Sequence, residues 1–305
     1  MANPQAYTHD ALGTRTVLQK GDIADVIIRI DVDDHLMLAR LPRVGTKDNN
    51  PKRLEDALQA VSLTNYHAEF SAAPAAVTTA RSTNQNWIQL FKKTATVSNT
   101  QNAIAQYGMS QEFDYQVGLR MEEIVRDVEH DIISDQAMQA STPANGRVGK
   151  MAGMGNIIAT NTDLVANWAQ AAFETLALAC VGTSGGNPNE IYLDAVRKTA
   201  AAGWTEEVTR MSNAAKSMIT EVVQYNTKFG WDCRFHWHKH MPVSIVGVGA
   251  SALALDFRPG LWEIKELLPL QRETIAYTGA GPAQQIMWSL TQLCGSEKAN
   301  FAFVG

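Results

Sequence analysis

The most regular spacing of apolar residues lies between positions 110 and 140, where they recur at steps of three and four. This spacing predicts one apolar stripe on a long helix. Ser110 is a suitable N-cap, and Glu112 stands in the first turn, where the helix dipole favours an acid. The segment STPANG (141–146) is expected to end a rod of roughly 45 Å. The predicted stripe consists of Phe113, Val117, Met121, Ile124, Val128 and Ile132.

The segments before this helix show no helical period. Residues 71–99 carry little charge, with small residues, Pro and Thr first and β-branched and aromatic residues afterwards. They predict a long two-stranded excursion with a mobile tip, which needs a partner to lie on. The first fifty or so residues are either a solvated surface segment or an arm that lies across a neighbouring subunit. Their later part is basic, through Arg40, Arg43, Lys47, Lys52 and Arg53.

The pattern after the helix indicates an α/β region. A glycine-rich connection comes first, and residues 164–180 then show a helical period through Leu164, Val165, Trp168, Ala172, Leu176 and Ala179. A strand is expected to enter a second helix near Asp194, and two strands are expected about a turn at Lys228–Gly230. Further strands are predicted at 244–249, 252–257, 261–268 and within 286–305.

Composition narrows the class of protein. Apolar residues make up 45% of the 305 residues and charged residues 19%, which is enough for a packed core in one large domain or two. The net charge of −5, without a basic tail, argues against a protein that mainly grips nucleic acid through phosphate contacts. Cys180, Cys233 and Cys294 are far apart, which favours reduced thiols in a cytoplasmic setting. With no signal peptide and no membrane-spanning segment, a soluble protein is expected.

The short motifs predict no catalytic residue and no cofactor. The glycine-rich segments at 182–188 and 247–251 lack the residues that complete a phosphate-binding or dinucleotide-binding loop. Glu129, His130 and Asp131 are consecutive on the long helix, so their side chains point in different directions. We interpret the acids of this helix as a solvated or subunit-facing surface.

Three histidines at every second position form the strongest chemical candidate. On an extended strand they would share one face, as zinc ligands often do; they are His236, His238 and His240. Two cations lie close by, no further ligand follows at a suitable spacing, and the alternate positions are apolar: Phe235, Trp237 and Met241. An ordinary half-buried strand, apolar inward and polar outward, is therefore the better interpretation, and no metal site is predicted.

Four stretches, in order along the chain, resemble one branch of the major capsid proteins of tailed double-stranded DNA bacteriophages, which have the Hong Kong 97 fold. They are NWIQLFKKTATVSNTQNAI (86–104), EFDYQVGLRMEEIVRDVEHDII (112–133), NGRVGKMAGMGNIIATN (145–161) and VVQYNTKFGWDCRFHWHKHMP (222–242). The resemblance runs from about residue 25 to the end and implies an α+β fold. Its implied parts are an N-terminal arm (1–53), an E-loop with flanking strands (54–99), a peripheral domain (100–145 and 255–305) with a spine helix (110–140), and an axial domain (146–254).

The resemblance also implies a non-enzymatic function. Such a protein assembles through pentamers and hexamers into an icosahedral shell that encloses double-stranded DNA, becomes part of the virion, and is assembled in the bacterial host cytoplasm. The first fifty residues are too short for a scaffolding domain, so a separate scaffolding protein is expected, with a portal and decoration proteins as further partners. The histidines leave pH sensing or an adventitious metal open. The alternatives are an encapsulin-like protein compartment and a metal-dependent enzyme using His236, His238 and His240.

Overall fold

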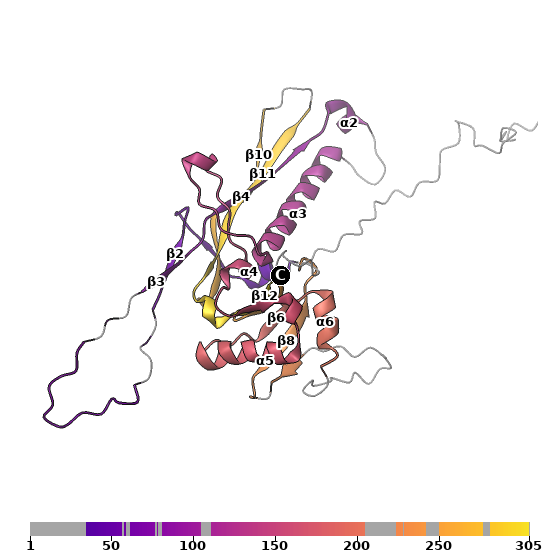
Figure 1. The fold of residues 1–305 in the computed structure, drawn as a ribbon. Coiled ribbons are helices and arrows are strands. Elements are labelled where there is room, and N and C mark those ends of the chain that lie inside the picture. The colour runs from indigo at the N-terminus through magenta and orange to yellow at the C-terminus, as the bar shows by residue number, and fades with distance from the viewer. Residues whose placement is uncertain are drawn as a thin grey trace, which may run out of the picture.

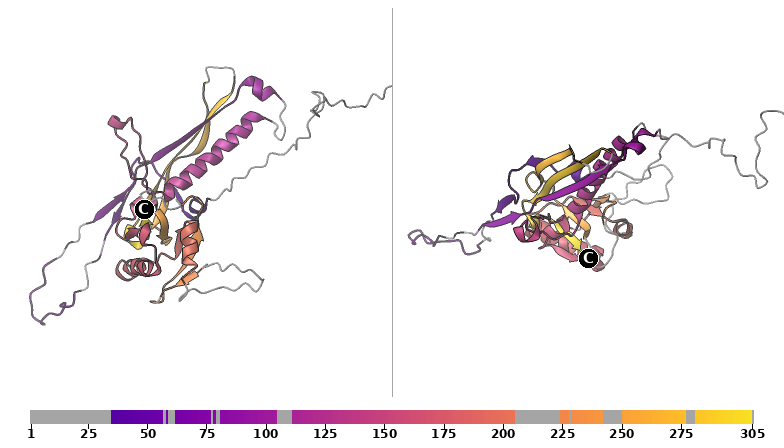
Figure 2. Two further views of the ribbon diagram at one scale, coloured as in Figure 1. Left: turned by 45° about the vertical axis from the view of Figure 1, so that its right-hand side comes forward. Right: turned by 90° about the horizontal axis from the view of Figure 1, so that it is seen from above.

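The computed structural model describes residues 35–56, 58, 62–76, 78, 81–104, 111–204, 224–227, 229–241, 250–276 and 281–304. They form a four-stranded sheet with a long helix along it and a six-stranded sheet with shorter helices (Figure 1). An excursion leaves the body between two short strands and projects away from it in each view (Figure 2). The predicted arm residues 1–34, Ser110, Lys228 and the predicted strand at 244–249 lie outside the described residues.

The four-stranded sheet combines strands from the N-terminal part and the C-terminal part of the chain. Its order is β1 (Arg43–Gly45), β10 (Trp262–Thr274), β11 (Ala283–Cys294) and β4 (Gln89–Thr96). The β10–β11 and β11–β4 pairs are antiparallel, whereas β1 runs parallel to β10. The apolar stripe of α3 (Glu112–Ile133) packs against this sheet, so the long helix and the sheet share one core.

The six-stranded sheet has the order β5 (Thr162–Leu164), β12 (Phe301–Val304), β9 (Ala250–Leu255), β6 (Glu190–Leu193), β8 (Asp232–Trp237) and β7 (Gln224–Asn226). Its helices are α5 (Gln170–Leu178) and α6 (Ala195–Ala201), and α6 begins next to Asp194, as predicted. The Asp194 side chain caps α6 by accepting the Arg197 N–H at 2.6 Å. Buried Phe173 on α5 contacts the rings of Tyr225, Trp231, Phe235 and Phe301. The sheet therefore has an aromatic core of its own.

The last strand corrects the expected division of the chain. The resemblance assigned residues 255–305 to the part that contains the long helix, but β12 pairs with β5 and β9 in the six-stranded sheet. The side chains of β12 explain this pairing, because Phe301 and Phe303 are buried in the aromatic core of the six-stranded sheet. The chain thus returns to the six-stranded sheet for its final strand.

The long helix has the predicted stripe but is shorter than predicted. Val117, Ile124, Val128 and Ile132 are buried, with Phe113 and Met121 packed beside them. However, α3 spans 22 residues, or about 33 Å, and ends at Ile133, so the expected end near residue 140 is wrong. The backbone after the helix bonds to the glycine-rich connection instead, because the N–H groups of Gly153 and Gly155 donate to the carbonyls of Gln136 and Ser134.

The helical period predicted across residues 164–180 is correct only in its second half. Leu164 lies in strand β5, opposite Val304, and is 59% exposed. Helix α5 begins six residues later, and its fully buried residues are Phe173 and Ala177, with Ala172 and Leu176 of the predicted stripe partly buried beside them. Pairing with the last strand of the chain, which no local pattern reveals, accounts for the difference.

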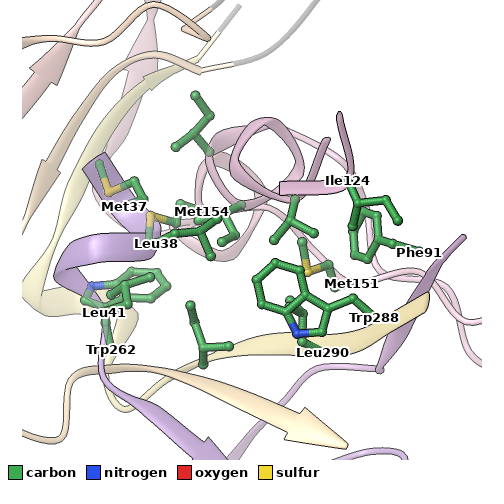
Figure 3. Close-up of a cluster of buried hydrophobic side chains, with 14 of the residues drawn as sticks. Met37, Leu38, Leu41, Phe91, Ile124, Met151, Met154, Trp262, Trp288 and Leu290 are labelled. Carbon is green, nitrogen blue, oxygen red and sulfur yellow. The ribbon is translucent and has the colours of Figure 1, made fainter. Parts of the chain in front are cut away.

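Part of the predicted arm folds against its own chain. Helix α1 (Leu36–Arg40) inserts apolar side chains into the main core, and β1 pairs with β10 (Figure 3). Met37, Leu38 and Leu41 are buried there. The interpretation as a solvated surface segment is therefore wrong for these three residues, because apolar burial holds them on the subunit itself. Residues 43–45 are exposed and are held by pairing with β10. We call α1 the arm helix.

The excursion is held at its base, and its described residues from 62 to 76 are all exposed. Its base is the antiparallel pair β2 (Lys52–Glu55) and β3 (Ser82–Gln85). Ser296 Oγ donates to Glu55 at 2.6 Å, and Asn84 Nδ2 donates to the Gly295 carbonyl at 3.0 Å. Beyond the base, residues 62–76 form no helix or strand. The excursion thus begins earlier than the predicted residue 71, and its two paired strands are β2 and β3. Phe70 is 96% exposed, Leu63 94% and Tyr66 80%.

The glycine-rich connection yields the first prediction. A Cβ added at Gly153 would overlap the Ser134 carbonyl, whereas a Cβ added at Gly118, on the exposed side of α3, would meet nothing within 4 Å. We expect Gly153→Ala to lower the free energy of unfolding by about 1–3 kcal/mol. The control, Gly118→Ala, should raise it by about 0.5–1 kcal/mol, because alanine favours a helix interior. Denaturant unfolding measures both, and equal effects of the two variants would contradict the assignment.

Candidate functional site

A buried carboxylate joins the arm helix, α3 and the end of β8. The Glu129 side chain is fully buried, and its Oε1 accepts the Met37 N–H and His238 Nε2–H, each at 2.8 Å. Its Oε2 accepts the Leu38 N–H at 2.9 Å. The interpretation of the acids of this helix as a solvated or subunit-facing surface is therefore wrong for Glu129. The sequence does contain a signal that Glu129 is buried. Its neighbours one helical turn later, Ile132 and Ile133 at i+3 and i+4, are apolar.

The hydrogen bonds of His238 define its protonation state. The ring is fully buried, and its Nδ1 accepts the backbone N–H of His240 at 3.2 Å. Because an accepting Nδ1 carries no proton, the proton of the neutral ring is on Nε2, which donates to Glu129. The junction thus consists of an ionised carboxylate, a neutral imidazole and two backbone donors.

A second set of contacts ties the arm helix to the six-stranded sheet. Arg40 pairs with Glu190 on β6, and its guanidinium lies 5.3 Å from the centre of the Phe257 ring. The Tyr192 hydroxyl donates to the same Glu190 at 2.9 Å. Burial raises the pKa of Tyr192 to about 12, so this hydroxyl keeps its proton and remains a donor. The arm helix therefore has polar anchors on both α3 and the sheet.

The three candidate histidines do not share one role. Strand β8 ends at Trp237, so His238 and His240 follow it in a turn. The predicted alternation is wrong at two positions, because Trp237 is 49% exposed whereas His238 is fully buried. Glu129 is the reason, since it offers a buried acceptor to the imidazole. His236 instead stacks on Tyr192 with ring centres 5.3 Å apart. Within the described part of the chain, no three His, Cys, Asp or Glu side chains are grouped so that they could hold a metal.

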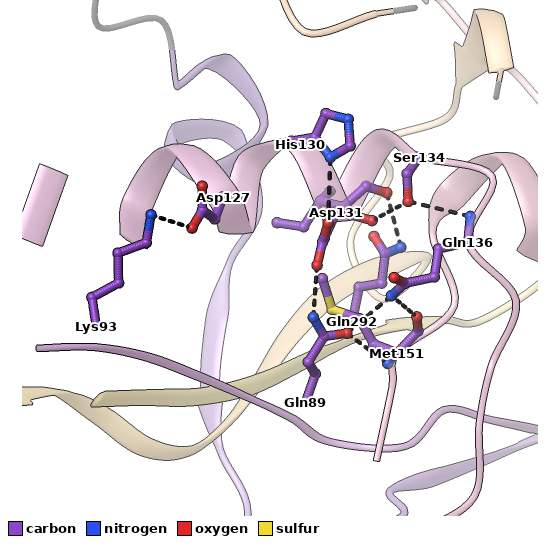
Figure 4. A network of polar contacts seen from close by, with 10 residues as sticks. Gln89, Lys93, Asp127, His130, Asp131, Ser134, Gln136, Met151 and Gln292 are labelled. Atoms are coloured by element: carbon purple, nitrogen blue, oxygen red, sulfur yellow. Dashed lines mark hydrogen bonds and ion pairs between the residues drawn. The ribbon is translucent and has the colours of Figure 1, made fainter. Parts of the chain in front are cut away.

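Amide side chains fasten the end of α3 to its surroundings. Gln89 on β4 donates to Asp131 Oδ2 at 2.6 Å and accepts from Gln136 Nε2 at 2.9 Å and from the Met151 N–H at 3.1 Å (Figure 4). Gln292 on β11 donates to the backbone carbonyls of α3 and of the glycine-rich connection at 3.0 and 2.8 Å. The helix end, the connection and both strands are therefore held together.

Ion pairs hold the middle of the same helix on the sheet. Lys93 Nζ on β4 lies 2.8 Å from Asp127 (Figure 4). It also lies 3.2 Å from Glu123. Burial acts to lower the pKa of Lys93, but hydrogen bonds and attraction to these two carboxylates outweigh it and raise the pKa. Lys93 thus remains charged and is engaged within its own subunit.

Comparison with known proteins identifies the family. The family model described as SU10 major capsid protein matches residues 10–305. This chain belongs to that family. A stretch of 82 residues is 37% identical to the major capsid protein of Escherichia phage Phieco32, covering 27% of this chain and 23% of that protein, so the match spans about a quarter of the relative. The family is the one that the sequence resemblance indicated, because its model is described as a major capsid protein.

Solved structures confirm the predicted α+β Hong Kong 97 fold. The capsid of a native GTA particle is 13% identical with a TM-score of 0.64, over 94% of this chain and 95% of that one. The SrpI encapsulin from Synechococcus elongatus PCC 7942 is 11% identical with a TM-score of 0.59, over 94% and 92%. At these identities the similarity concerns the fold.

Among the helices that the structure describes, none combines the length and the hydropathy needed to cross a membrane.

The histidines give a prediction of pH dependence. Burial, and then nearby Lys198, Arg234 and Arg40, lower the pKa of His236, whereas a hydrogen bond to Asp131 raises the pKa of His130. A lowered folded-state pKa means that the unfolded chain binds protons first as the pH falls below about 6.5, so acidification destabilises the fold. His130 acts with the opposite sign, because its stabilisation is complete in acid and is lost as the pH rises through its raised pKa.

Substitution of either histidine should therefore change the slope of stability against pH between about 7 and 5. We expect His236→Gln to reduce the destabilisation in acid and His130→Gln to increase it. Denaturant unfolding at a series of pH values measures both. Slopes that change in the same direction in the two variants would contradict the assignment.

Proposed function

We propose that this capsid protein assembles through pentamers and hexamers of itself into an icosahedral shell that encloses double-stranded DNA. The excursion carries the proposal. Leu63, Tyr66 and Phe70 are nearly fully exposed on a segment whose residues from 62 to 76 are all exposed. Full burial of such a side chain contributes about 1.5–3 kcal/mol, which the isolated subunit does not gain. A second copy of the chain is the surface that we propose for them.

The parts of the fold take corresponding roles in this proposal. The excursion with its flanking strands (54–99) acts as the E-loop, α3 as the spine helix of a peripheral domain, and the six-stranded sheet as the core of an axial domain (146–254). The final strand is added to the axial domain because it pairs within that sheet. Each contact between subunits can contribute a modest free energy, because many such contacts act together around every subunit.

The charge of the chain supports DNA as the enclosed material. A strongly basic inner wall would bind the genome by counterion release and hinder its movement, whereas this chain carries a net charge of −5. We propose enclosure without sequence-specific binding. On the family resemblance, a separate scaffolding protein, a portal and decoration proteins are the expected partners. Assembly is placed in the bacterial host cytoplasm and is followed by maturation of a procapsid.

One alternative function is supported by a specific observation. The similarity to the SrpI encapsulin means that the same fold also suits a compartment. The two kinds of shell differ in what they enclose. Shells purified from the native source and treated with nuclease would retain protected double-stranded DNA under our proposal, and co-purifying protein cargo without DNA under the alternative.

Assembly itself is tested by negative-stain electron microscopy with sedimentation velocity on the purified chain. We expect closed particles, or pentameric and hexameric rings. A monomer or dimer that stays small under crowding, and on co-expression with neighbouring genes, would contradict the proposal.

A variant of the excursion tests where the assembly energy comes from. We expect Leu63→Asn with Phe70→Asn to raise the concentration needed for assembly more than tenfold, because two apolar side chains no longer become buried. The unfolding midpoint of the subunit should stay the same, since both side chains are exposed. Leu164→Asn is the control, because Leu164 is also exposed but lies on β5. An equal loss of assembly in the control would show that the excursion has no special role.

A further inference from the structure

The four-stranded sheet has one protected edge and one open edge. At the β10 edge, β1 covers residues 264–266, and two register shifts follow, with Pro269 between Leu268 and Gln271. A proline has no backbone N–H, and both proline and irregular register keep further strands from adding to an edge. Strand β4, at the other edge, has neither a proline nor a register shift over its eight residues. The β4 edge is therefore the one that can accept another strand.

The backbone of β4 points alternately toward β11 and toward the open edge. The Val97 N–H, directly after the strand, donates to the Pro282 carbonyl on the β11 side. Because the direction alternates along a strand, the odd-numbered residues face β11 and the even-numbered residues face the edge. Among the described residues, none forms a backbone hydrogen bond with this outward set. The outward residues, all of them exposed, are Leu90, Lys92, Thr94 and Thr96.

The chain itself covers the first part of this edge. The carbonyls of Pro51 and Asn49 accept the N–H groups of Asn86 and Ile88 at 3.4 and 3.1 Å. These two donors belong to the same even-numbered set that continues into β4. The segment before the excursion thus pairs with the edge as far as residue 88, and no described segment continues the pairing from residue 90 onward.

The two sides of the open edge differ in character. On the side of α3, a cavity of about 320 Å³ lies against β4. The charged residues of its lining, with their ion-pair partner and the exposed lysine beside them, are Lys93, Arg120, Glu123, Asp127 and Lys92. Three cations against two carboxylates leave one net positive charge. On the opposite face of the sheet, the Leu90 side chain is 46% exposed. The edge thus suits a strand with one acidic face and one apolar face.

The sequence just before the arm helix has these two faces. Residues 25–33 read DVIIRIDVD, and every even-numbered position is a Val or an Ile. The odd-numbered positions, apart from Ile27, carry three aspartates and one arginine, so that face is acidic. Such alternation of β-branched and charged residues is typical of a strand. These nine residues lie outside the described part of the chain, and their number matches the eight residues of β4.

We propose that residues 25–33 of one subunit add as a fifth strand to the open edge of β4 in a second subunit. The pairing rests on the proposed shell, because it needs a neighbouring copy. Backbone hydrogen bonds along residues 90–96 hold the added strand, and its side chains select it. Its acidic face lies over Lys93 and Arg120, and its apolar face extends the side of Leu90.

A neighbour supplies the strand rather than the same subunit. The sheet order places β1, which follows the arm helix, at the edge opposite β4. Figure 3 shows the arm helix at one end of the core and Phe91 of β4 at the other. Direct pairing of two β4 edges is disfavoured, because Lys92 and Lys93 of both copies would meet. With an acidic strand, the same lysines become attractive partners.

Hydrogen exchange measured by mass spectrometry on the full chain tests the added strand. The quantity compared is the protection of peptides covering residues 89–97 and 22–34, in dilute subunits and in assembled particles. In particles we expect exchange of both peptides to slow by about tenfold or more, because the outward amides of β4 and the amides of the added strand become hydrogen-bonded. Sedimentation velocity records separately whether particles form.

Two adjacent prolines in the arm provide the decisive variant. Ile27→Pro with Ile28→Pro lacks two consecutive backbone N–H groups, so one missing donor faces β4 in either register. In particles of this variant, β4 should exchange as fast as in dilute subunits. Ile27→Val with Ile28→Val is the matched control, because it keeps both donors and the β-branched side chains, and it should match the wild type.

Each result separates the added strand from the shell. Particles in which β4 gains no protection, or keeps it in the proline variant, overturn the added strand and leave the shell standing. Protection of β4 that is already complete in dilute subunits also overturns it, because the strand then comes from the same subunit. If the proline variant forms no particles, the wild-type particles decide. There, a gain of protection in both peptides supports the added strand, and a gain in only one overturns it. A wild-type chain that forms no particles overturns the shell and the added strand together.

Discussion

The structure depends on the condition that a charge removed from water must be paired and fully hydrogen-bonded. Glu129 meets it only because donors arrive from two other segments, the arm helix at positions 37 and 38 and the turn after β8 at position 238. Satisfaction of the carboxylate therefore determines where the arm helix, α3 and the turn after β8 lie relative to one another. An apolar side chain of similar size could stabilise the core as well, but it would accept many more positions of the arm helix. Glu129 therefore contributes specificity, because it fixes one position of the arm helix relative to α3 and to the turn after β8.

Beyond Glu129, the subunit consists of a body held together by side-chain contacts and an excursion that is attached to it at the base. Amide and ion-pair contacts fasten α3 to the four-stranded sheet, and an aromatic core holds the six-stranded sheet. Among its described residues, the excursion is fixed to the body at its base, through Arg53, Glu55 and Asn84. This division suits a subunit that must keep its own shape while it leaves apolar surface free for neighbours.

Local patterns predicted those elements whose partners are visible in the local sequence. The stripe of α3, the capping of α6 by Asp194 and the antiparallel β7–β8 pair all rest on short-range signals, and the structure contains them. The errors arose where a distant segment decides the outcome. Leu164 joins a strand because residue 304 lies beside it, and α3 ends at Ile133 because the glycine-rich connection bonds to the backbone that follows. Glu129 was misread for the same reason, since its partners lie about 90 and 109 residues away.

The order of strands in the four-stranded sheet has a consequence for synthesis. Strands β1 and β4 come from the first hundred residues, but they pair with β10 and β11, which begin at Trp262 and Ala283. At translation rates of about 5–20 residues per second, β4 waits roughly 10–40 s for its partner. The base of the excursion is anchored still later, by Gly295 and Ser296. A nascent or truncated chain therefore has the excursion but not its anchors, so under the proposed assembly an unfinished subunit would not hold its contact surface in place.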